Sequence, residues 1–338
     1  MQSGASDFDA LRRRIFYPKT DLMMGVDDLH AFLHSKPERT AAFLEIIPSL
    51  FEGDNLDATP LAGGTFHDVY LLKNDQDLIL RIFAGPKPDE TLSIDHHLSN
   101  LLHDIGIPSV QSHIYGSGDF DYQVTDFATG ATLKDYKGKP EWHDLLAKTG
   151  DTFARLHGIA TQGYGLLSAE ALEGDTLHGL HETWAEYINL NLADHIAFCL
   201  KEGDISDAEA QTITSLFQNW TMPSFEPALL HGDPGPHNIF TDGLEITALI
   251  DWEDALSGDP LYEVAFWATF HPDADYEAFL NGYYAGADRP ADFDKNFWMY
   301  YLRVSLAKTV HRHLFKYTDA PGALRASTRI QKALERMP

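Results

Sequence analysis

The stretch LLHGDPGPHNIFTDGLEITALIDWED, residues 229–254, constrains the fold more than any other part of the chain. It holds two short β-type runs around Asp242-Gly243, which is a strong signal for a hairpin. In the loop before it, Pro234 and Pro236 fix the backbone and lack N–H donors, whereas Gly235 between them permits an unusual turn. We therefore expect a stiff loop followed by a β-hairpin.

Three polar residues stand at the ends of these segments. Asp233 and Asn238 lie in the loop, and Asp251 follows the last apolar run. The spacing Asp-x-x-x-x-Asn, with a second aspartate thirteen residues later, is typical of the catalytic and metal-binding segments of kinases. Phosphoryl transfer needs a carboxylate near the attacking hydroxyl and oxygen ligands for Mg²⁺. We predict that Asp233 orients or deprotonates an acceptor hydroxyl and that Asn238 and Asp251 bind Mg²⁺.

The motifs HGDPGPHNIF, IDWEDA and GDPLYEVA together resemble the aminoglycoside phosphotransferase family, from about Leu61 to about Trp267. The resemblance implies an α+β, bilobal, protein-kinase-like fold, with a small antiparallel-sheet N-lobe and a larger, mainly helical C-lobe. It also implies ATP or GTP as phosphoryl donor, Mg²⁺, and a small cationic acceptor. Within the family, the YEVA run, the ETW helix start and a strand arginine are most similar to the hygromycin B phosphotransferase branch.

Three regions are expected along the chain. Residues 1–54 are predicted to form a helical extension that packs on the N-lobe, because DDLHAFLHS and ERTAAFLEIIPSLF have apolar residues at helical spacing. Residues 55–127 are predicted to form the nucleotide-binding N-lobe. Residues 128–338 are predicted to form the C-lobe, with the catalytic loop and the acceptor pocket.

The glycine turn of the N-lobe and the hinge between the lobes are the expected nucleotide contacts. A glycine turn between strands lets backbone N–H groups approach phosphates. The hinge resembles the adenine-binding segment of kinases, where recognition is mostly through the main chain. The predicted contacts are Gly63, Gly64 and Thr65 in the turn and Asp126, Phe127 and Ala128 in the hinge.

Arg81, in the predicted strand LILRIF, stands where kinases usually have a lysine. Arginine can contact phosphate oxygens with two donors at once, although it fills the space differently from lysine. Its acidic partner is expected in the helix predicted over residues 90–105, and Asp95 is preferred to Glu90.

The C-lobe is expected to be mainly helical, with helices over residues 142–157, 177–200 and 206–220. The resemblance places the acceptor pocket in this lobe, lined by carboxylates that pair with ammonium groups and by aromatic walls. The candidate residues are Glu182, Trp184, Glu186, Glu253, Asp254, Phe270 and Asp273. Glu263 is instead expected to support the catalytic loop.

Charge and composition restrict the partners and the location. The chain has 51 acidic and 25 basic residues and a net charge of −26, so nucleic acid and anionic membranes would be repelled. Its one cysteine, Cys199, cannot form an internal disulfide. The sequence has no apolar export segment and no run long enough to span a bilayer, so a cytoplasmic location is expected. Its 17 histidines lack the spacing of a zinc motif.

Three functions stay open from the sequence. The first is an aminoglycoside O-phosphotransferase, and the second is a kinase of another small metabolite such as choline, homoserine, a thiosugar or a macrolide. The third is a non-catalytic binding module with a kinase-like fold, which the presence of Asp233, Asn238 and Asp251 together disfavours. The first two differ only in the acceptor pocket, where the sequence says least. It does not predict an oligomeric state.

Overall fold

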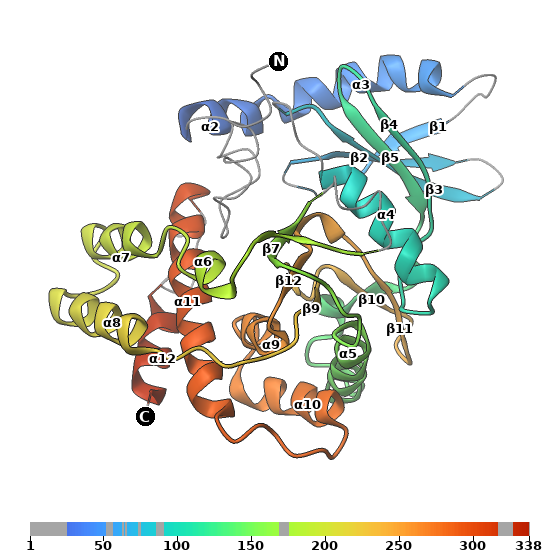
Figure 1. The fold of residues 1–338 in the computed structure, drawn as a ribbon. Coiled ribbons are helices and arrows are strands. Elements are labelled where there is room, and N and C mark those ends of the chain that lie inside the picture. The colour runs from blue at the N-terminus through green and yellow to red at the C-terminus, as the bar shows by residue number, and fades with distance from the viewer. Residues whose placement is uncertain are drawn as a thin grey trace.

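The computed structural model describes residues 26–51, 57–62, 64, 66–73, 76–85, 91–168, 176–316 and 327–337. Of the predicted site residues, Gly63, Thr65 and Glu90 lie outside these ranges, as does the start of the predicted extension. Figure 1 shows two parts, a sheet with its covering helices above and a larger, mainly helical part below. This is the α+β arrangement expected from the sequence.

The upper part is built on one antiparallel sheet of five strands in the order β1-β2-β3-β5-β4. Alternate residues of β2 are buried, which is the pattern of a strand with one face on a core. The strands are β1 (Asp57–Pro60), β2 (Asp68–Lys73), β3 (Asp77–Phe83), β4 (Ser112–Ser117) and β5 (Asp121–Asp126). In register, Arg81 of β3 lies opposite Gln123 of β5.

Within the described ranges, two helices precede the sheet, and a third lies between β3 and β4. The first two are α2 (Val26–His34) and α3 (Lys36–Leu50), and Phe43 and Ile47 of α3 are buried in the same core as the strands. The inserted helix α4 (Thr91–Asp104) buries Leu98 in the larger core of the helical part. Helix α4 therefore connects the sheet to the helical part. The division of the chain at residues 54 and 127 stays a prediction.

The lower part packs its helices around one large core. Helices α5 and α10 can lie close together because Gly150 and Gly282 have no Cβ. A Cβ at either position would collide with the backbone of the other helix. The long helix α11 is buried along most of its length. The helices are η1 (Leu133–Tyr136), α5 (Trp142–Leu156), α6 (Trp184–Ile188), α7 (Leu192–Lys201), α8 (Asp207–Asn219), η3 (Trp252–Asp254), α9 (Pro260–Ala268), α10 (Asp273–Tyr284), α11 (Phe293–Leu314) and α12 (Thr328–Arg336).

Two small antiparallel sheets of the lower part carry the motif-rich stretch. Their orders are β11-β10-β6 and β8-β7-β12-β9. The predicted catalytic loop, residues 231–238, connects β9 of the four-stranded sheet to β10 of the three-stranded sheet. The strands are β6 (Ala131–Thr132), β7 (Tyr164–Leu167), β8 (Gly179–His181), β9 (Ala228–Leu230), β10 (Ile239–Thr241), β11 (Ile246–Leu249) and β12 (Leu256–Gly258). The predicted hairpin is confirmed, because β10 pairs antiparallel with β11.

The prediction of one long helix over residues 177–200 is wrong. Strand β8 comes first, and a capping box between Thr183 and Glu186 then begins α6 at Trp184. Asn191 adopts a left-handed conformation with φ of 54°, which interrupts the helical path before α7. The apolar spacing was that of two short helices. In the ranges that the structure describes, no helix is both long and apolar enough to cross a membrane.

Candidate active site

The catalytic loop is anchored by the buried carboxylate of Glu263, on the first turn of α9. Its two oxygens accept hydrogen bonds from the backbone N–H groups of His231 (2.8 Å) and Gly232 (2.7 Å). His157, the residue after the end of α5, contacts the same carboxylate at 2.9 Å. Gly232 has φ of +84°, and a Cβ there would collide with the backbone oxygen of Asp254, so only glycine fits. Glu263 thus supports the loop, as expected from the sequence.

Asn238 ties the loop to the hairpin. Its Nδ2 donates to the backbone oxygen and to Oδ2 of Asp233, both at 3.1 Å. These two donations leave the side-chain oxygen Oδ1 available as an acceptor or metal ligand. Its backbone oxygen accepts a hydrogen bond from Ile250 N at 3.0 Å, so Asn238 lies beside the residue that precedes Asp251. The hairpin brings together the three polar residues predicted to form the centre.

Asp251 adopts a left-handed backbone conformation with φ of 70°, which is unfavourable for a residue other than glycine. The next residue, Trp252, is fully buried with its ring 4.5 Å from the ring of His231. Its backbone N–H donates to Asp95 Oδ2 of α4 at 2.8 Å. Packing and hydrogen bonding of Trp252 thus hold the strained turn that carries the Asp251 carboxylate.

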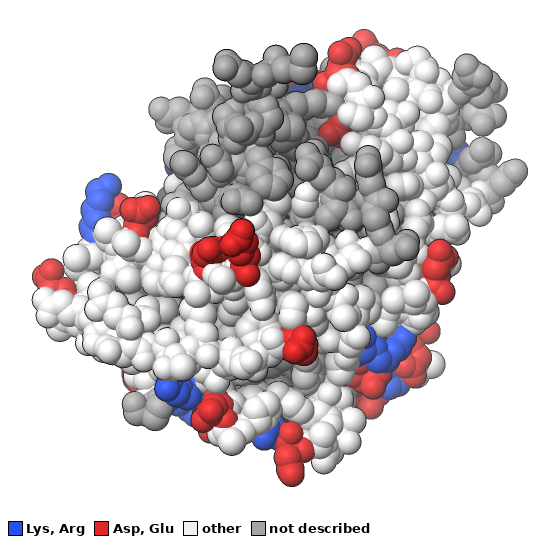
Figure 2. Space-filling model, viewed as in Figure 1, with Lys and Arg blue, Asp and Glu red and all other residues white. Residues whose placement is uncertain are grey.

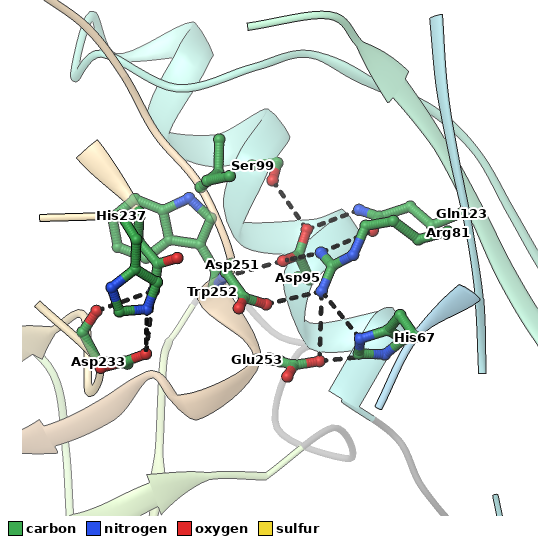
Figure 3. A network of polar contacts seen from close by, with 12 residues as sticks. His67, Arg81, Asp95, Ser99, Gln123, Asp233, His237, Asp251, Trp252 and Glu253 are labelled. Atoms are coloured by element: carbon green, nitrogen blue, oxygen red, sulfur yellow. Dashed lines mark hydrogen bonds and ion pairs between the residues drawn. The ribbon is translucent and has the colours of Figure 1, made fainter. Parts of the chain in front are cut away.

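Arg81 is the centre of a buried polar network that crosses from the sheet to this turn (Figure 3). Its Nη1 donates to Asp95 Oδ2 at 2.8 Å, and its Nη2 donates to Asp251 Oδ1 at 2.6 Å. The same Nη2 is 3.4 Å from Glu253 Oε2, which His67 contacts at 3.3 Å. Burial alone would lower the pKa of Arg81, but the three carboxylates raise it, so the guanidinium stays charged.

Asp95 is the acidic partner of Arg81, in agreement with the preference stated above. It also accepts a hydrogen bond from Gln123 Nε2 of β5 at 2.7 Å. Burial favours the neutral acid, but the charge of Arg81 and these hydrogen bonds lower the pKa of Asp95 below its usual value. An ionised Asp95 therefore links β3, β5, α4 and the Asp251 turn.

Asp233 has a cationic environment. His237 Nε2 lies 3.4 Å from Asp233 Oδ2, and this contact raises the pKa of His237. Burial would raise the pKa of Asp233, but the hydrogen bond and charge of His237 and the charge of Lys308 lower it to about 2. The side chain of Asp233 is 30% exposed. Asp233 is therefore an ionised carboxylate that a small molecule can reach, and such a group can accept a hydrogen bond from an acceptor hydroxyl.

The donor set fits Mg²⁺ rather than a metal held by the protein alone. Mg²⁺ usually binds through one or two protein oxygens together with substrate phosphates and water. Asn238 and Asp251 offer one amide oxygen and one carboxylate on neighbouring positions of the hairpin. Within the described ranges, no group of three or more His, Cys, Asp or Glu residues is arranged to hold a metal ion. The roles of Asn238 and Asp251 in metal binding stay predictions.

Of the predicted nucleotide contacts, Gly64 and the hinge residues are described. Gly64 has φ of +65°, and Lys36 of α3 donates to the backbone oxygens of Gly64 and His67. Asp126 contacts His113 at 2.7 Å, and Phe127 is exposed. Ala128 follows them, after the end of β5 at Asp126. Their contact with a nucleotide stays a prediction.

The predicted acceptor residues come from several elements of the chain. Glu253 belongs to the Arg81 network, and Asp273 pairs with Lys332 and with Arg336. Trp184 is only 4% exposed, and its Nε1 donates to Tyr300 Oη at 2.9 Å inside the core. Each of these three side chains is thus engaged with another residue of the protein.

The other four acceptor candidates lie on different elements. Glu186 completes the capping box of α6 and Glu182 is exposed just before that helix. Asp254 ends η3, next to the catalytic loop. Phe270 also lies beside the catalytic loop, because its ring is 6.3 Å from the ring of His237. The acceptor assignments stay predictions.

Sequence reasoning missed three residues of the site. His67 bridges toward Glu253 from the segment before β2, and His237 contacts Asp233 from within the loop. The position of His237, four residues after Asp233, is a signal that could have found it. Lys308 comes from α11, where nothing in the sequence relates it to residues seventy positions earlier.

The antiparallel sheet, the helical part and the anchored aspartate loop between them define a phosphotransferase with a protein-kinase-like fold. Solved structures agree. The structure of aminoglycoside phosphotransferase APH(4)-Ia matches with a TM-score of 0.64 and 20% identity, over 88% of this chain and 98% of that one. A choline/ethanolamine kinase family protein from Mesorhizobium loti matches with a TM-score of 0.58 and 20% identity, over 89% and 94% of the two chains. The predicted fold is therefore confirmed.

The chain belongs to the phosphotransferase enzyme family (APH), whose sequence pattern matches residues 57–295. Among curated proteins it is similar to hygromycin-B 4-O-kinase of Escherichia coli, with 30% identity over 169 residues. That match covers 48% of this chain and 48% of the relative, so it spans about half the length of the curated protein. The family predicted from the motifs is confirmed.

Proposed function

We propose that this chain transfers the γ-phosphoryl group of ATP to a hydroxyl of an aminoglycoside, and that hygromycin B is the first acceptor to test. The observation that carries the proposal is the anchored loop, in which Asn238 contacts Asp233 and lies beside the Asp251 turn. Two comparisons support the acceptor class. One is the similarity to the Escherichia coli hygromycin-B 4-O-kinase. The other is a fold match to a ternary complex of APH(4)-Ia with AMP-PNP and hygromycin B.

In this proposal Asp233 accepts a hydrogen bond from the acceptor hydroxyl. A carboxyl group with a pKa of about 2 is a weak base, so Asp233 orients the hydroxyl and takes its proton late in the transfer. Glu263 and Asn238 keep the carboxylate in place through the contacts described above. Positioning of this kind supplies most of the rate enhancement in phosphoryl transfer.

On the donor side, Asn238 and Asp251 would hold Mg²⁺, which when bound neutralises charge on the phosphate oxygens. Arg81 is the candidate phosphate contact, because its guanidinium lies beside Asp251, with Nη2 2.6 Å from Oδ1. Arginine binds phosphate oxygens with paired donors. A cytoplasmic location, where ATP is available, belongs to the same proposal.

A cationic acceptor fits the charge of the chain. The net charge of −26 creates a negative potential that attracts polycations at low ionic strength. Figure 2 shows acidic side chains on the surface of the helical part. Since salt screens such attraction, the apparent KM for a cationic acceptor should rise with ionic strength.

The direct test is ADP release with a panel of acceptors. Hygromycin B, other aminoglycosides, choline, homoserine and a macrolide would each be added to the enzyme with ATP and Mg²⁺. The proposal predicts rapid ADP release with hygromycin B or another aminoglycoside, and resistance to that antibiotic in a sensitive bacterium that expresses the chain. Release with choline, homoserine or the macrolide alone would replace the proposed acceptor class.

A further inference from the structure

The first turn of α3 contacts the segment that connects β1 with β2. Lys36, the first residue of α3, donates from Nζ to the backbone oxygen of Gly64 and, at 2.9 Å, to that of His67. Gly64 has φ of +65°, and a Cβ there would lie 2.9 Å from the His67 oxygen, so the two residues are close together. One ammonium group thus contacts two carbonyl groups at the turn that is predicted to bind phosphates.

Two further residues of α3 contact the beginning of β2. Arg39 Nε donates to Asp68 Oδ2 at 3.2 Å, and Thr40 Oγ1 donates to Asp68 Oδ1. Asp68 is the first residue of β2 and is only 1% exposed. Tyr70, two residues further along β2, donates from Oη to the backbone oxygen of Thr40 at 3.0 Å. Polar contacts therefore join α3 both to Gly64 and His67 and to the strand that follows them.

His67 connects the Lys36 contact to the network around Arg81. The His67 ring lies 3.3 Å from Glu253 Oε2 through Nε2 and 3.4 Å from Arg81 Nη2 through Nδ1 (Figure 3). Lys36 binds the backbone oxygen of the same histidine, which is buried. The contacts of Lys36 therefore extend from the predicted phosphate-binding turn to the residues that surround the candidate phosphate contact.

The stability of α3 does not explain a lysine at this position. The N-terminus of a helix carries a partial positive charge, so a cation in the first turn is unfavourable for the helix itself. Its two backbone acceptors lie outside α3, on a segment that is predicted to bind a ligand. A loop that is already held in its binding conformation loses less conformational freedom when the ligand binds, and this raises affinity. The contacts of Lys36 therefore favour a role in nucleotide binding.

We propose that Lys36 is a positioning residue for the nucleotide, whose ammonium group holds the backbone of Gly64 and His67 in the conformation that receives the phosphates. The inference rests on the proposed function, in which ATP is the phosphoryl donor, and on the predicted contact of Gly64 with it. The matched family pattern begins at residue 57, after α3. The inference thus gives a helix outside that pattern a part in substrate binding.

The test removes the charge of Lys36 and measures ATP binding separately from turnover. Lys36→Met should raise the KM for ATP, and the Kd for AMP-PNP with Mg²⁺ measured by calorimetry, by about 5- to 30-fold, because the two carbonyl groups lose a charged donor. At saturating ATP, kcat and the KM for the acceptor should change by less than about twofold, because the catalytic loop keeps its anchor on Glu263. Lys36→Arg should recover most of the affinity, because a guanidinium keeps the charge and has paired donors.

Backbone hydrogen exchange separates positioning from an effect of charge alone. Without nucleotide, peptides that contain Gly64 and His67 should exchange faster in Lys36→Met than in the wild type, because their backbone loses the contacts with α3. Weaker ATP binding together with unchanged exchange would overturn the positioning role, because charge alone would then account for the affinity.

Lys148→Met is the matched control. Lys148 of α5 also donates from a helix to a backbone oxygen between two strands, that of Leu244, and it contacts Glu245 at 2.8 Å. Its replacement should leave the affinity for AMP-PNP unchanged. Wild-type affinity in Lys36→Met would overturn the inference. Equal losses of kcat and affinity, with a lower melting temperature that Lys36→Arg does not restore, would also overturn it, because that result is expected of a purely structural lysine.

Failure of the proposed function can be told apart from failure of this inference, because AMP-PNP binding is measured without an acceptor. If the wild type phosphorylates none of the panel but binds AMP-PNP more tightly than Lys36→Met, only the acceptor class is rejected and the role of Lys36 is supported. If the wild type phosphorylates an aminoglycoside and the two proteins bind AMP-PNP equally, only the role of Lys36 is overturned. A wild type that does not bind AMP-PNP would overturn both.

Discussion

Arg81 of β3 donates a 2.6 Å hydrogen bond to Asp251, which lies 170 residues further along the chain. The pair joins the candidate phosphate contact to a candidate metal ligand. It is reinforced by Asp95, which accepts hydrogen bonds from both Arg81 and the backbone of Trp252. The proposed ATP-binding side of the site is thus one network that spans the sheet, α4 and the turn after β11.

Replacing Arg81 by lysine should destabilise the fold. One ammonium group cannot reach Asp95 and Asp251 along the two directions that the guanidinium spans. Leaving a buried carboxylate without its partner should lower the free energy of unfolding by about 1 to 3 kcal/mol. Urea denaturation measures the change. Arg289→Lys is the control, since its partner Glu277 is partly exposed and a surface pair contributes little. Equal effects of the two changes would contradict the importance of the network.

Asp251→Ala should remove the dependence of ATP binding on Mg²⁺. Without the carboxylate, the metal loses one of its two predicted protein ligands, whereas Arg81 keeps its contact with Asp95. Calorimetry with and without Mg²⁺ would measure both affinities. We expect the Mg²⁺-dependent gain of the wild type to disappear and the affinity without metal to persist. A variant that keeps the full gain would show that the metal is held elsewhere.

Glu263→Gln should weaken the anchor of the catalytic loop. The carboxylate accepts hydrogen bonds from the backbone of His231 and Gly232, and an amide offers only one oxygen for these two donors. One buried N–H group would lose its acceptor, at a cost of about 1 to 3 kcal/mol. Both the free energy of unfolding and kcat should fall. Glu277→Gln, on the exposed face of α10, should change neither. A normal kcat in Glu263→Gln would mean that the loop holds its geometry without this anchor.

His195 should make the fold less stable in acid. Burial and the charge of Arg303, which donates to His195 Nδ1 at 3.2 Å, lower the folded-state pKa to about 3. In the unfolded chain the histidine takes up a proton below about pH 6.5. Between these values only the unfolded state binds the proton, so stability should fall by about 1.4 kcal/mol per pH unit as pH decreases. Urea denaturation from pH 7 to pH 5 would measure the slope. His195→Gln should make it shallower, and an unchanged slope would contradict the assignment.

The sequence predicted the parts of the site that are close together along the chain. The loop, the hairpin and the order of Asp233, Asn238 and Asp251 follow from turn chemistry and strand alternation within twenty-six residues. The pairing of Arg81 with Asp95 was predicted because Arg81 stands at the position of the kinase lysine, and an acidic partner was therefore expected in the helix that follows. The helix predicted over residues 206–220 is present as α8, because its apolar spacing and the capping box at Ser206 are also local features of the sequence.

Contacts between distant segments were not predictable from one sequence. Glu253 is an acidic residue in a polar stretch, and only the fold shows that His67 and Arg81 engage it. The surroundings of Lys308 on α11 could not be predicted either, because Thr269 and Phe270, which it contacts, follow the distant helix α9. The long helix predicted over residues 177–200 failed because a left-handed Asn191 outweighs apolar periodicity. Each miss concerns tertiary contacts or backbone geometry rather than composition.

The most direct measurement is ADP release by Asp233→Asn and wild type, with hygromycin B as acceptor and ATP binding measured in parallel. Asparagine keeps the size of the side chain but cannot accept the proton of the hydroxyl. We expect kcat to fall by about 10²- to 10⁴-fold while ATP binding stays at the wild-type level. Wild-type turnover in Asp233→Asn would contradict the account, because no phosphoryl transfer could then depend on this carboxylate.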